Sequence, residues 1–302
     1  MPVRLRVVMI AGATLVALVS ATSASAAPGE LDPTFGSGGV VQLLPSDEES
    51  HAKGIAVQPD DKVVVSGYEV PGNAVILRLL ENGQPDPGFG AGGKVVTPLP
   101  GGFSEFRTLA VQADGKIVAA GSAKGAVDGD FLLARYNADG SPDPGFGGGD
   151  GVTIVPVGTE FDLAEAVSIG PGGKIVATGR AMAGAKVVAG VAVLLANGTP
   201  DTGFAGDGTT TIETPTGNDS GVAVEMLADG RILIGDSSGA GAGKGFSLVQ
   251  LLPTGAFDPS FGGGDGIVLT PIPAEGLMGE APGRITDLDL LGDGRIITAG
   301  YG

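Results

Sequence analysis

Short apolar runs follow one another along this chain, and each is bounded by glycine or proline. The runs are about five to eight residues long and rich in β-branched residues, and no helical spacing persists after the first segment. Such runs predict β-strands joined by turns. The 56 glycines and 21 prolines therefore mark turns between strands rather than a disordered chain.

One pair of runs recurs five times, and its two runs are joined by a tight turn that predicts a β-hairpin. The glycine of turns such as Asp114-Gly115 reaches positive φ without a Cβ clash. We expect the basic residue after each turn to be a solvated strand start. The hairpins span Ala56–Gly67, Ala110–Gly121, Val167–Gly179, Val224–Gly235 and Leu288–Gly300, and the basic residues are Lys62, Lys116, Lys174, Arg231 and Arg295.

A third run, a DPxFG-like phrase and a fourth run complete the unit. The phrase occurs as LDPTFG, PDPGFG, PDPGFG, PDTGFA and FDPSFG, in units that start near residues 31, 85, 142, 200 and 257. Its phenylalanines are Phe35, Phe89, Phe146, Phe204 and Phe261, separated by 54, 57, 58 and 57 residues. Each unit thus contains four short strands, and the units recur at a nearly constant spacing. This pattern predicts an all-β fold, a β-propeller of about five four-stranded antiparallel blades.

The DPxFG phrase has a predicted role in this fold. Its aspartate accepts hydrogen bonds from backbone amides two residues on, and its proline presets φ for the turn. We expect the phenylalanine to lie in the gap between neighbouring sheets, as a structural anchor of the repeat. The fourth unit has Ala205 in place of glycine and lacks the second proline, so we expect its turn to be looser.

The combination of LDPTFG-SGG, AVQ-x-DGKIV-x-AG and ARYN-x-DG closely resembles the delta-60 repeat, a bacterial family of β-propeller-like units in exported proteins. The resemblance covers Leu31–Gly302. The order of elements is also similar to NHL propellers. The resemblance implies architecture and export, and it carries over neither an activity nor catalytic residues.

If each blade begins with its hairpin and ends with the strand after the DPxFG phrase, as in NHL propellers, the blades span about 52–98, 106–157, 163–213 and 221–272. A fifth hairpin follows at 284–302. Either the chain is a fragment of a longer array, which we favour, or the fifth blade is incomplete and exposes a sheet edge. Residues 39–44 are a candidate for the outer strand of that blade. Phe261 precedes Arg295 by 34 residues, against 27 or 28 in the other units, which indicates an insertion near Pro271–Gly283.

The first residues predict a signal peptide, residues 1–26, ahead of a repeat domain at 27–302. Arg4 and Arg6 precede the apolar run Val7–Val19, and Ala24-Ser25-Ala26 offers a cleavage site. The 13 apolar residues of that run would cover only about 20 Å of a hydrocarbon core of about 30 Å. We therefore expect a secreted, extracellular protein without a membrane span after cleavage.

The net charge and the absence of cysteine limit the binding partners and the chemistry that this protein can have. Without the signal peptide the chain has 15 basic and 34 acidic residues, a net charge of −19. Such an acidic protein repels phosphate backbones, so nucleic acid is not an expected partner. The chain has no cysteine, which excludes disulfides, thiolate catalysis and cysteine metal ligands.

Catalytic and cofactor signatures are weak. His51 is the only histidine, and the equivalent residue of the next unit is Glu105. No G-x-S-x-G occurs, and Gly239–Gly245 lacks the Ser/Thr and the strand-to-helix setting of a phosphate loop. Turn aspartates are the remaining candidates for a calcium site, although turn formation is the favoured explanation for them. These aspartates are Asp128, Asp130, Asp139, Asp150 and Asp265.

Two classes of function follow. The first is a secreted, non-enzymatic binding or scaffold module for a protein or glycan ligand, with no cofactor. The alternative is a propeller enzyme, a carboxylate-based glycan hydrolase or lyase, which requires acids that converge at one mouth of the channel. Acids near the inner strands are Glu165, Glu225, Asp287 and Asp289, and they do not recur between units.

Overall fold

The computed structural model describes most of the repeat region of the chain. The described residues are 7–9, 29–42, 50–70, 72–99, 101–124, 129–215, 217–237, 245–271 and 284–301. The predicted signal peptide lies outside them apart from residues 7–9. The loop predicted at residues 239–245 and the insertion at residues 271–283 also lie outside them, apart from one residue of each.

Four antiparallel sheets of four strands and one two-stranded sheet follow one another along the chain. The strands of the first two are β3 (Ser50–Val57), β4 (Val63–Glu69), β5 (Asn73–Leu79), β6 (Lys94–Thr97), β7 (Ser104–Val111), β8 (Ile117–Lys124), β9 (Gly129–Tyr136) and β10 (Val152–Val155). Those of the next two are β11 (Leu163–Ile169), β12 (Ile175–Ala183), β13 (Lys186–Leu194), β14 (Thr209–Ile212), β15 (Gly221–Met226), β16 (Ile232–Ser237), β17 (Gly245–Leu251) and β18 (Ile267–Pro271). The fifth sheet is β19 (Arg284–Leu290) and β20 (Ile296–Tyr301).

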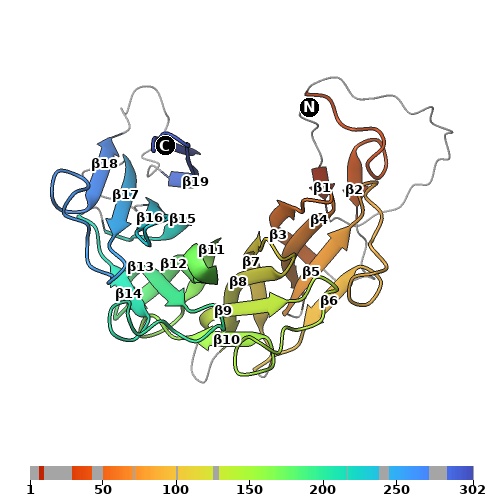
Figure 1. Cartoon of the computed structure of the whole chain (residues 1–302), viewed down its shortest axis with the longest axis horizontal. Coiled ribbons are helices and arrows are strands. Elements are labelled where there is room, and N and C mark those ends of the chain that lie inside the picture. The colour runs from red at the N-terminus through yellow and green to blue at the C-terminus, as the bar shows by residue number, and fades with distance from the viewer. Residues whose placement is uncertain are drawn as a thin grey trace.

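Each sheet has the strand order of its sequence, as expected for a propeller blade. The sheets lie along an open arc, with β1 and β2 at one end and β19 near the other (Figure 1). The predicted all-β fold, with a fifth blade of two strands in the described residues, is therefore confirmed. None of the described residues forms a helix long and apolar enough to cross a membrane.

The N-terminal segment differs from the prediction. The candidate outer strand of the fifth blade forms β2 (Val40–Gln42), which pairs in parallel with β1 (Val7–Met9) and not with β20. The Gly36 amide donates to the Asn82 carbonyl at 2.8 Å, so this segment lies against the first blade. The opening of the arc separates it from the fifth (Figure 1).

Apolar side chains are buried between the sheets rather than inside any one of them. In β8, Ile117 and Ala119 belong to the cluster shared by the first and second blades. Val118 and Ala120 belong to the cluster shared by the second and third. Alternate residues of one strand thus serve two interfaces, because successive side chains point to opposite faces. This is why the strands appear in the sequence as continuous apolar runs.

The DPxFG turn lies where one blade meets the next. Each of its five aspartates accepts a backbone amide two residues on through Oδ1, at 2.8 to 3.0 Å. Four of its phenylalanines are at most 1% exposed: Phe35, Phe89, Phe146 and Phe204. Phe261 is half-buried, because it faces the two-stranded fifth blade.

A backbone hydrogen bond crosses the joints at the four fully buried phenylalanines. The amide after Phe89 donates to the Asp139 carbonyl of the next blade at 2.8 Å, and equivalent bonds follow Phe35, Phe146 and Phe204. The residue after the acceptor is a glycine with positive φ, as at Gly140. A Cβ on Gly140 would lie 3.0 Å from the Phe89 ring, so close contact between blades requires the glycine.

The basic residues after the hairpin turns are not merely solvated strand starts, so that prediction was wrong for four of the five. Each of the four reaches Oδ2 of the DPxFG aspartate of its own blade. The pairs are Lys62–Asp86 at 3.5 Å, Lys116–Asp143 at 2.8 Å, Lys174–Asp201 at 2.5 Å and Arg231–Asp258 at 3.2 Å. Arg295 instead pairs with the exposed Asp293 of its own turn.

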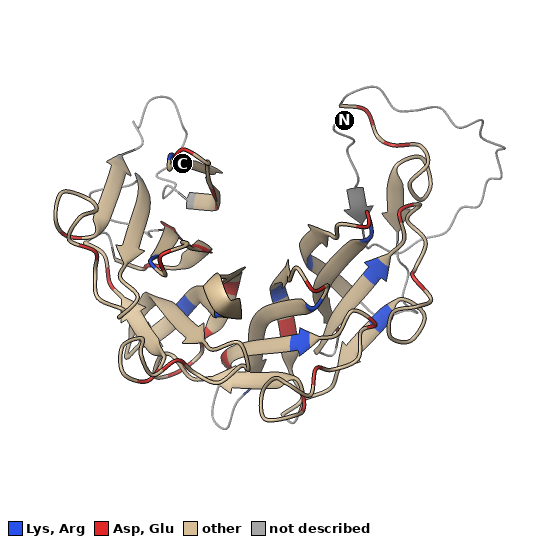
Figure 2. Cartoon of the chain, viewed as in Figure 1, with Lys and Arg blue, Asp and Glu red and all other residues tan. Residues whose placement is uncertain are grey.

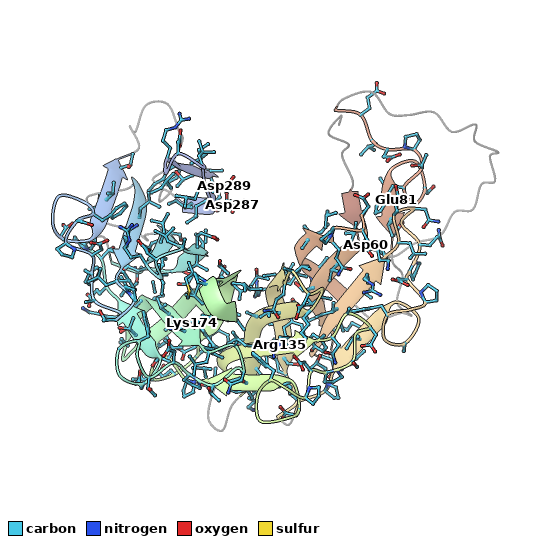
Figure 3. The ribbon with its side chains drawn as sticks, viewed as in Figure 1. Asp60, Glu81, Arg135, Lys174, Asp287 and Asp289 are labelled. Atoms are coloured by element: carbon cyan, nitrogen blue, oxygen red, sulfur yellow. The ribbon has the colours of Figure 1, made fainter. Side chains whose placement is uncertain are left out.

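An arginine reinforces two of the joints. Arg135 donates to Asp143 at 2.6 Å, lies 4.8 Å from the centroid of the Phe146 ring and donates to the Ala196 carbonyl of the next blade. Arg78 makes the same three contacts one blade earlier. Figure 3 shows Arg135 and Lys174 at these joints. One aspartate thereby holds its own turn, the hairpin of its blade and the arginine that reaches the next.

The fourth turn keeps this geometry, contrary to the expectation of a looser one. Asp201 accepts the Gly203 amide at 3.0 Å, and Ala205 donates to the Thr254 carbonyl at 2.9 Å. Ala205 adopts φ 50°, a region that glycine occupies more readily. Packing between the blades therefore imposes the turn despite the alanine.

Phe146→Ala is predicted to lower the free energy of unfolding by about 3 to 5 kcal/mol, because it removes a fully buried ring and leaves a cavity between blades. The matched control is Phe261→Ala, in the same phrase but half-buried, with a clearly smaller loss expected. Urea titration of both variants measures the difference. Equal losses would show that burial at the joint does not set the contribution of the ring.

Asp143 predicts an acid-sensitive contribution to stability. Burial raises the pKa of its carboxyl, but hydrogen bonds from Lys116, the Gly145 amide and Arg135 outweigh burial and lower the pKa to about 2. A lowered pKa stabilises the fold above about pH 4, and this contribution is lost as the pH falls toward 2. Between pH 7 and pH 2 the melting temperature of the wild type should fall, and that of Asp143→Asn should fall by less. Asp150→Asn, in an exposed turn, should behave like the wild type.

Candidate functional site

Every inner strand carries a β-bulge at the same position. The register shifts between Ala52 and Gly54 in β3, and at equivalent places in β7, β11, β15 and β19. A bulge adds one unpaired residue and re-aims its side chain. The five bulge residues are Lys53, Arg107, Glu165, Val222 and Thr286. These bulges were not predicted from the sequence, because the glycines beside Lys53 and Val222 have no counterpart beside the other three bulge residues.

The bulge residues line one pocket on the inner side of the arc, with a cavity volume of about 290 Å³. Each of the five sheets contributes its inner strand to the wall, so the pocket lies where a propeller has its central channel. The rest of the wall combines small side chains, such as Thr108 and Ala166, with larger apolar ones, such as Leu109. The pocket exists only when successive blades are stacked.

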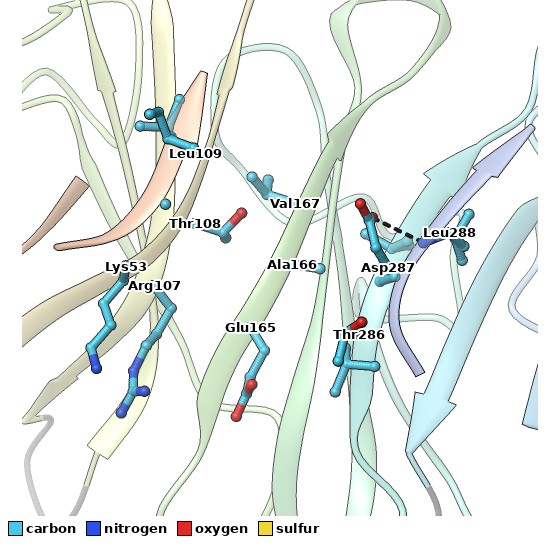
Figure 4. A pocket seen from close by; sticks show the side chains of 15 residues that line it. Lys53, Arg107, Thr108, Leu109, Glu165, Ala166, Val167, Thr286, Asp287 and Leu288 are labelled. Atoms are coloured by element: carbon cyan, nitrogen blue, oxygen red, sulfur yellow. Dashed lines mark hydrogen bonds between the residues drawn. The ribbon is translucent and has the colours of Figure 1, made fainter. Parts of the chain in front are cut away.

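Charged side chains in the pocket are unevenly placed. Figure 4 shows Lys53 and Arg107 on neighbouring inner strands, with side chains that extend in the same direction. Glu165 points toward the same end, whereas the carboxylate of Asp287 points toward the other and accepts the Leu288 amide at 2.9 Å. Arg107 also pairs with the buried Glu105 at 3.0 Å.

The two ends of the blades differ in how strictly the units repeat. The DPxFG turns and hairpin turns lie at one end and are similar in every unit. The connections β4 to β5, β6 to β7 and their equivalents lie at the opposite end, and they differ in length and residue type between units. We call this second end the variable end. Each bulge comes early in its inner strand, close to the variable end.

Aromatic side chains gather at the variable end of the first blade. The rings of His51 and Tyr68 stack with centroids 4.7 Å apart, and the ring of Phe103 lies 6.4 Å from that of Tyr68. Lys53 Nζ lies 5.7 Å from the Tyr68 centroid. Phe103 is 38% exposed. The only histidine of the chain therefore belongs to an aromatic and basic cluster.

The acids that the sequence placed near the inner strands have different environments. Glu165 and Asp287 line the pocket, and Asp287 and Asp289 lie on the side of β19 that faces the opening of the arc (Figure 3). Glu225 accepts a hydrogen bond from Ser168 of the preceding blade at 3.0 Å. The structure does not bring the carboxylates of Glu165 and Asp287 together at one end of the pocket.

Most calcium candidates serve in turns. Asp139, Asp150 and Asp265 each accept a backbone amide two residues on, at 2.9 to 3.0 Å. Asp130 lies in β9, and Asp128 lies outside the described residues. No three His, Cys, Asp or Glu side chains come together as a metal site in the described part of the chain. Figure 2 shows that acidic residues concentrate in the connecting loops.

The comparisons with known proteins concern the repeat itself. Four segments, residues 58–89, 112–146, 171–204 and 227–261, match the family model described as "Domain of unknown function (DUF5122) beta-propeller". Four repeats of this chain match that family. The segments begin near each hairpin turn and end at or next to the phenylalanine of the DPxFG phrase, which are the two parts that meet at a joint. No curated protein sequence matches the chain.

Similar solved structures also have low sequence identity to this propeller. Virginiamycin B lyase from Staphylococcus aureus has 14% identity and a TM-score of 0.46, over 85% of this chain and 65% of the lyase. The PQQ-bound aldose sugar dehydrogenase from Streptomyces coelicolor has 16% identity and a TM-score of 0.44, over 85% of this chain and 80% of the dehydrogenase. The extracellular domain of a putative one component system from B. thetaiotaomicron has 9% identity and a TM-score of 0.42, over 85% of this chain and 27% of that domain.

The fourth blade of the propeller departs from the repeat at a buried position. A residue of the first strand faces a glycine of the second in four units, as Ala164 faces Gly179. In the fourth unit the order is exchanged, and Gly221 faces Asp236. The predicted hairpin Val224–Gly235 therefore ends one residue before the position that the other units fill with this glycine. A Cβ on Gly179 would lie 1.9 Å from the Leu163 carbonyl oxygen, so this exchange needs an altered local backbone.

Asp236 is fully buried beside a second buried carboxyl, that of Asp219. Burial raises the pKa of Asp236 well above its usual value, and the negative charge of Asp219 raises it further. Asp219 accepts hydrogen bonds from the amide of Thr214 at 2.7 Å and from its hydroxyl at 2.5 Å. Two like charges at such a buried site repel each other, and this repulsion adds to the effect of burial on the pKa of Asp236.

Asp236→Asn is predicted to change how stability depends on pH. A raised pKa means that Asp236 stabilises the fold while it is protonated, and this contribution is lost as the pH rises through its folded-state pKa. Between pH 4 and pH 9, the melting temperature of the wild type should fall relative to that of the variant, because asparagine stays neutral. Parallel melting curves for the two proteins would contradict a protonated Asp236.

Proposed function

We propose that this protein is an exported, non-enzymatic binding module of the delta-60 repeat type, which takes a glycan or protein ligand at the variable end of its propeller. Export rests on the segment from Arg4 to Ala26, which has the order of a secretory signal. The proposed location is outside the cell. The proposed site is the mouth of the pocket formed by the bulge residues.

The observation that carries the proposal is the contrast between the two ends. Joint residues such as Asp143, Phe146 and Gly198 have equivalents in nearly every unit, because every joint needs the same contacts. The bulge residues occupy equivalent backbone positions but include two cations, an acid, an apolar residue and a hydroxyl. Stability requires no such variety, whereas recognition of a ligand does.

The enzyme alternative has less support from the described residues. Hydrolysis of a glycosidic bond commonly requires two carboxylates that face the same bond. Glu165 and Asp287 line one pocket but point toward its opposite ends (Figure 4). We therefore favour binding over turnover at this site.

The test is a binding screen of the secreted protein on glycan and protein arrays, followed by mass spectrometry of each bound ligand. We expect saturable binding and recovery of the ligand unchanged. Thr286→Trp should weaken binding, because it places a large ring at an exposed position on the pocket wall. Glu81→Trp, at an exposed position of the opposite end, is the matched control.

Two results would contradict the proposal. Cleavage of a ligand by the wild type would favour the enzyme alternative. A screen without any saturable ligand, or a ligand lost equally in Thr286→Trp and Glu81→Trp, would argue against a site at the variable end.

A further inference from the structure

We infer that the ligand at the variable end is an acidic oligosaccharide, held by Lys53 and Arg107 and stacked on the aromatic cluster of the first blade. This inference rests on the proposed function, since it names the class of ligand for the same site. Three features of the described residues carry it: two cations whose side chains extend in the same direction, an aromatic cluster beside them that includes the exposed Phe103, and the negative net charge of the chain.

The two cations are placed to act together. Lys53 and Arg107 are the bulge residues of adjacent inner strands, β3 and β7, and Figure 4 shows their side chains extending in the same direction. Lys53 is exposed, and Arg107 is half-buried with one guanidinium nitrogen on Glu105. The remaining donors of Arg107 suit a carboxylate, which accepts two parallel hydrogen bonds from a guanidinium.

The aromatic cluster supplies the second kind of contact. The face of an aromatic ring is negative, so it attracts the C–H bonds of a sugar ring, which carry partial positive charge. Tyr68 stacks on His51 and lies 5.7 Å from Lys53 Nζ, and Phe103 presents a partly exposed ring nearby. Aromatic residues make up only 5% of the chain. Their gathering beside two cations at the variable end is not required by the joints.

The charge of the whole chain limits the length of the ligand. The net charge is −17 with the predicted signal segment included, so a long polyanion would be repelled by the surface beyond the two cations. A short acidic oligosaccharide places its charge at Lys53 and Arg107 and its ring faces on Tyr68 and Phe103. An acidic peptide would pair with the two cations, but it has no sugar ring to stack on Tyr68 and Phe103. We therefore favour the carbohydrate.

The experiment uses isothermal titration with hexagalacturonate and a hyaluronan hexasaccharide, each beside its methyl-esterified form. Esterification removes the charge and keeps the sugar rings. We expect at least one acid to bind, and its ester to bind at least tenfold more weakly. Hexaglutamate is titrated as the acidic peptide.

Variants separate the contribution of the two cations from that of the aromatic cluster. Lys53→Met should weaken binding of the acid about tenfold and reduce its dependence on salt, because one charge contact is removed. Arg107→Lys should also weaken binding of the acid, because it keeps the charge but loses the two parallel hydrogen bonds. Phe103→Ala should weaken binding of acid and ester alike. Arg295→Met, at an exposed ion pair beside the hairpin turn of the fifth blade, is the control for a cation lost at the opposite end and should bind as the wild type does.

Each other outcome overturns the inference in a recognisable way. Equal affinity for acid and ester would remove the role of the cations. Tighter binding of hexaglutamate than of both sugars would indicate an acidic peptide partner. If neither sugar binds but the arrays give another ligand that Thr286→Trp weakens, the ligand class is wrong and the proposed function stands. If no ligand is found on the arrays either, the proposed function fails as well.

Discussion

The contact between the DPxFG turn and the following blade is the interaction on which the rest of the structure depends. A four-stranded sheet has two apolar faces and cannot bury both by itself. At each joint a phenylalanine fills the space between sheets, and one aspartate holds the turn that presents it. The same aspartate receives the cation of the hairpin, so a single carboxylate links three parts of a blade. Phe261, which faces only two strands, shows how burial falls when the next blade is small.

Because the joints hold one end of every blade, the opposite end is free to differ between units. The channel pocket lies near that end, and its wall takes one bulge from each blade. The exchange of glycine and Asp236 in the fourth blade shows that even a buried position tolerates change when the facing residue changes with it. The raised pKa of Asp236 favours its neutral form, and a neutral carboxyl is compatible with burial beside Asp219.

Much of the architecture was predictable, because the same short pattern specifies the same contacts five times. The predicted blades agree with the observed sheets to within two residues, from β3 to β18. The predictions failed where a residue acts through a distant partner. Lys116 looked like an exposed strand start, yet it pairs with an aspartate 27 residues away. The bulges at Lys53 and Arg107 were missed because the two sites share no local residue pattern, and the register of two strands decides where each bulge falls.

By itself, the sequence determined the number of units, the order of strands and the turns, since these depend on local residue types and on a period repeated along the chain. Only the tertiary structure decided which side chains meet at the pocket. Lys53, Arg107, Glu165 and Thr286 belong to four different units and become neighbours through the curvature of the stack. Curvature arises from how whole sheets pack on one another, and no single repeat contains it.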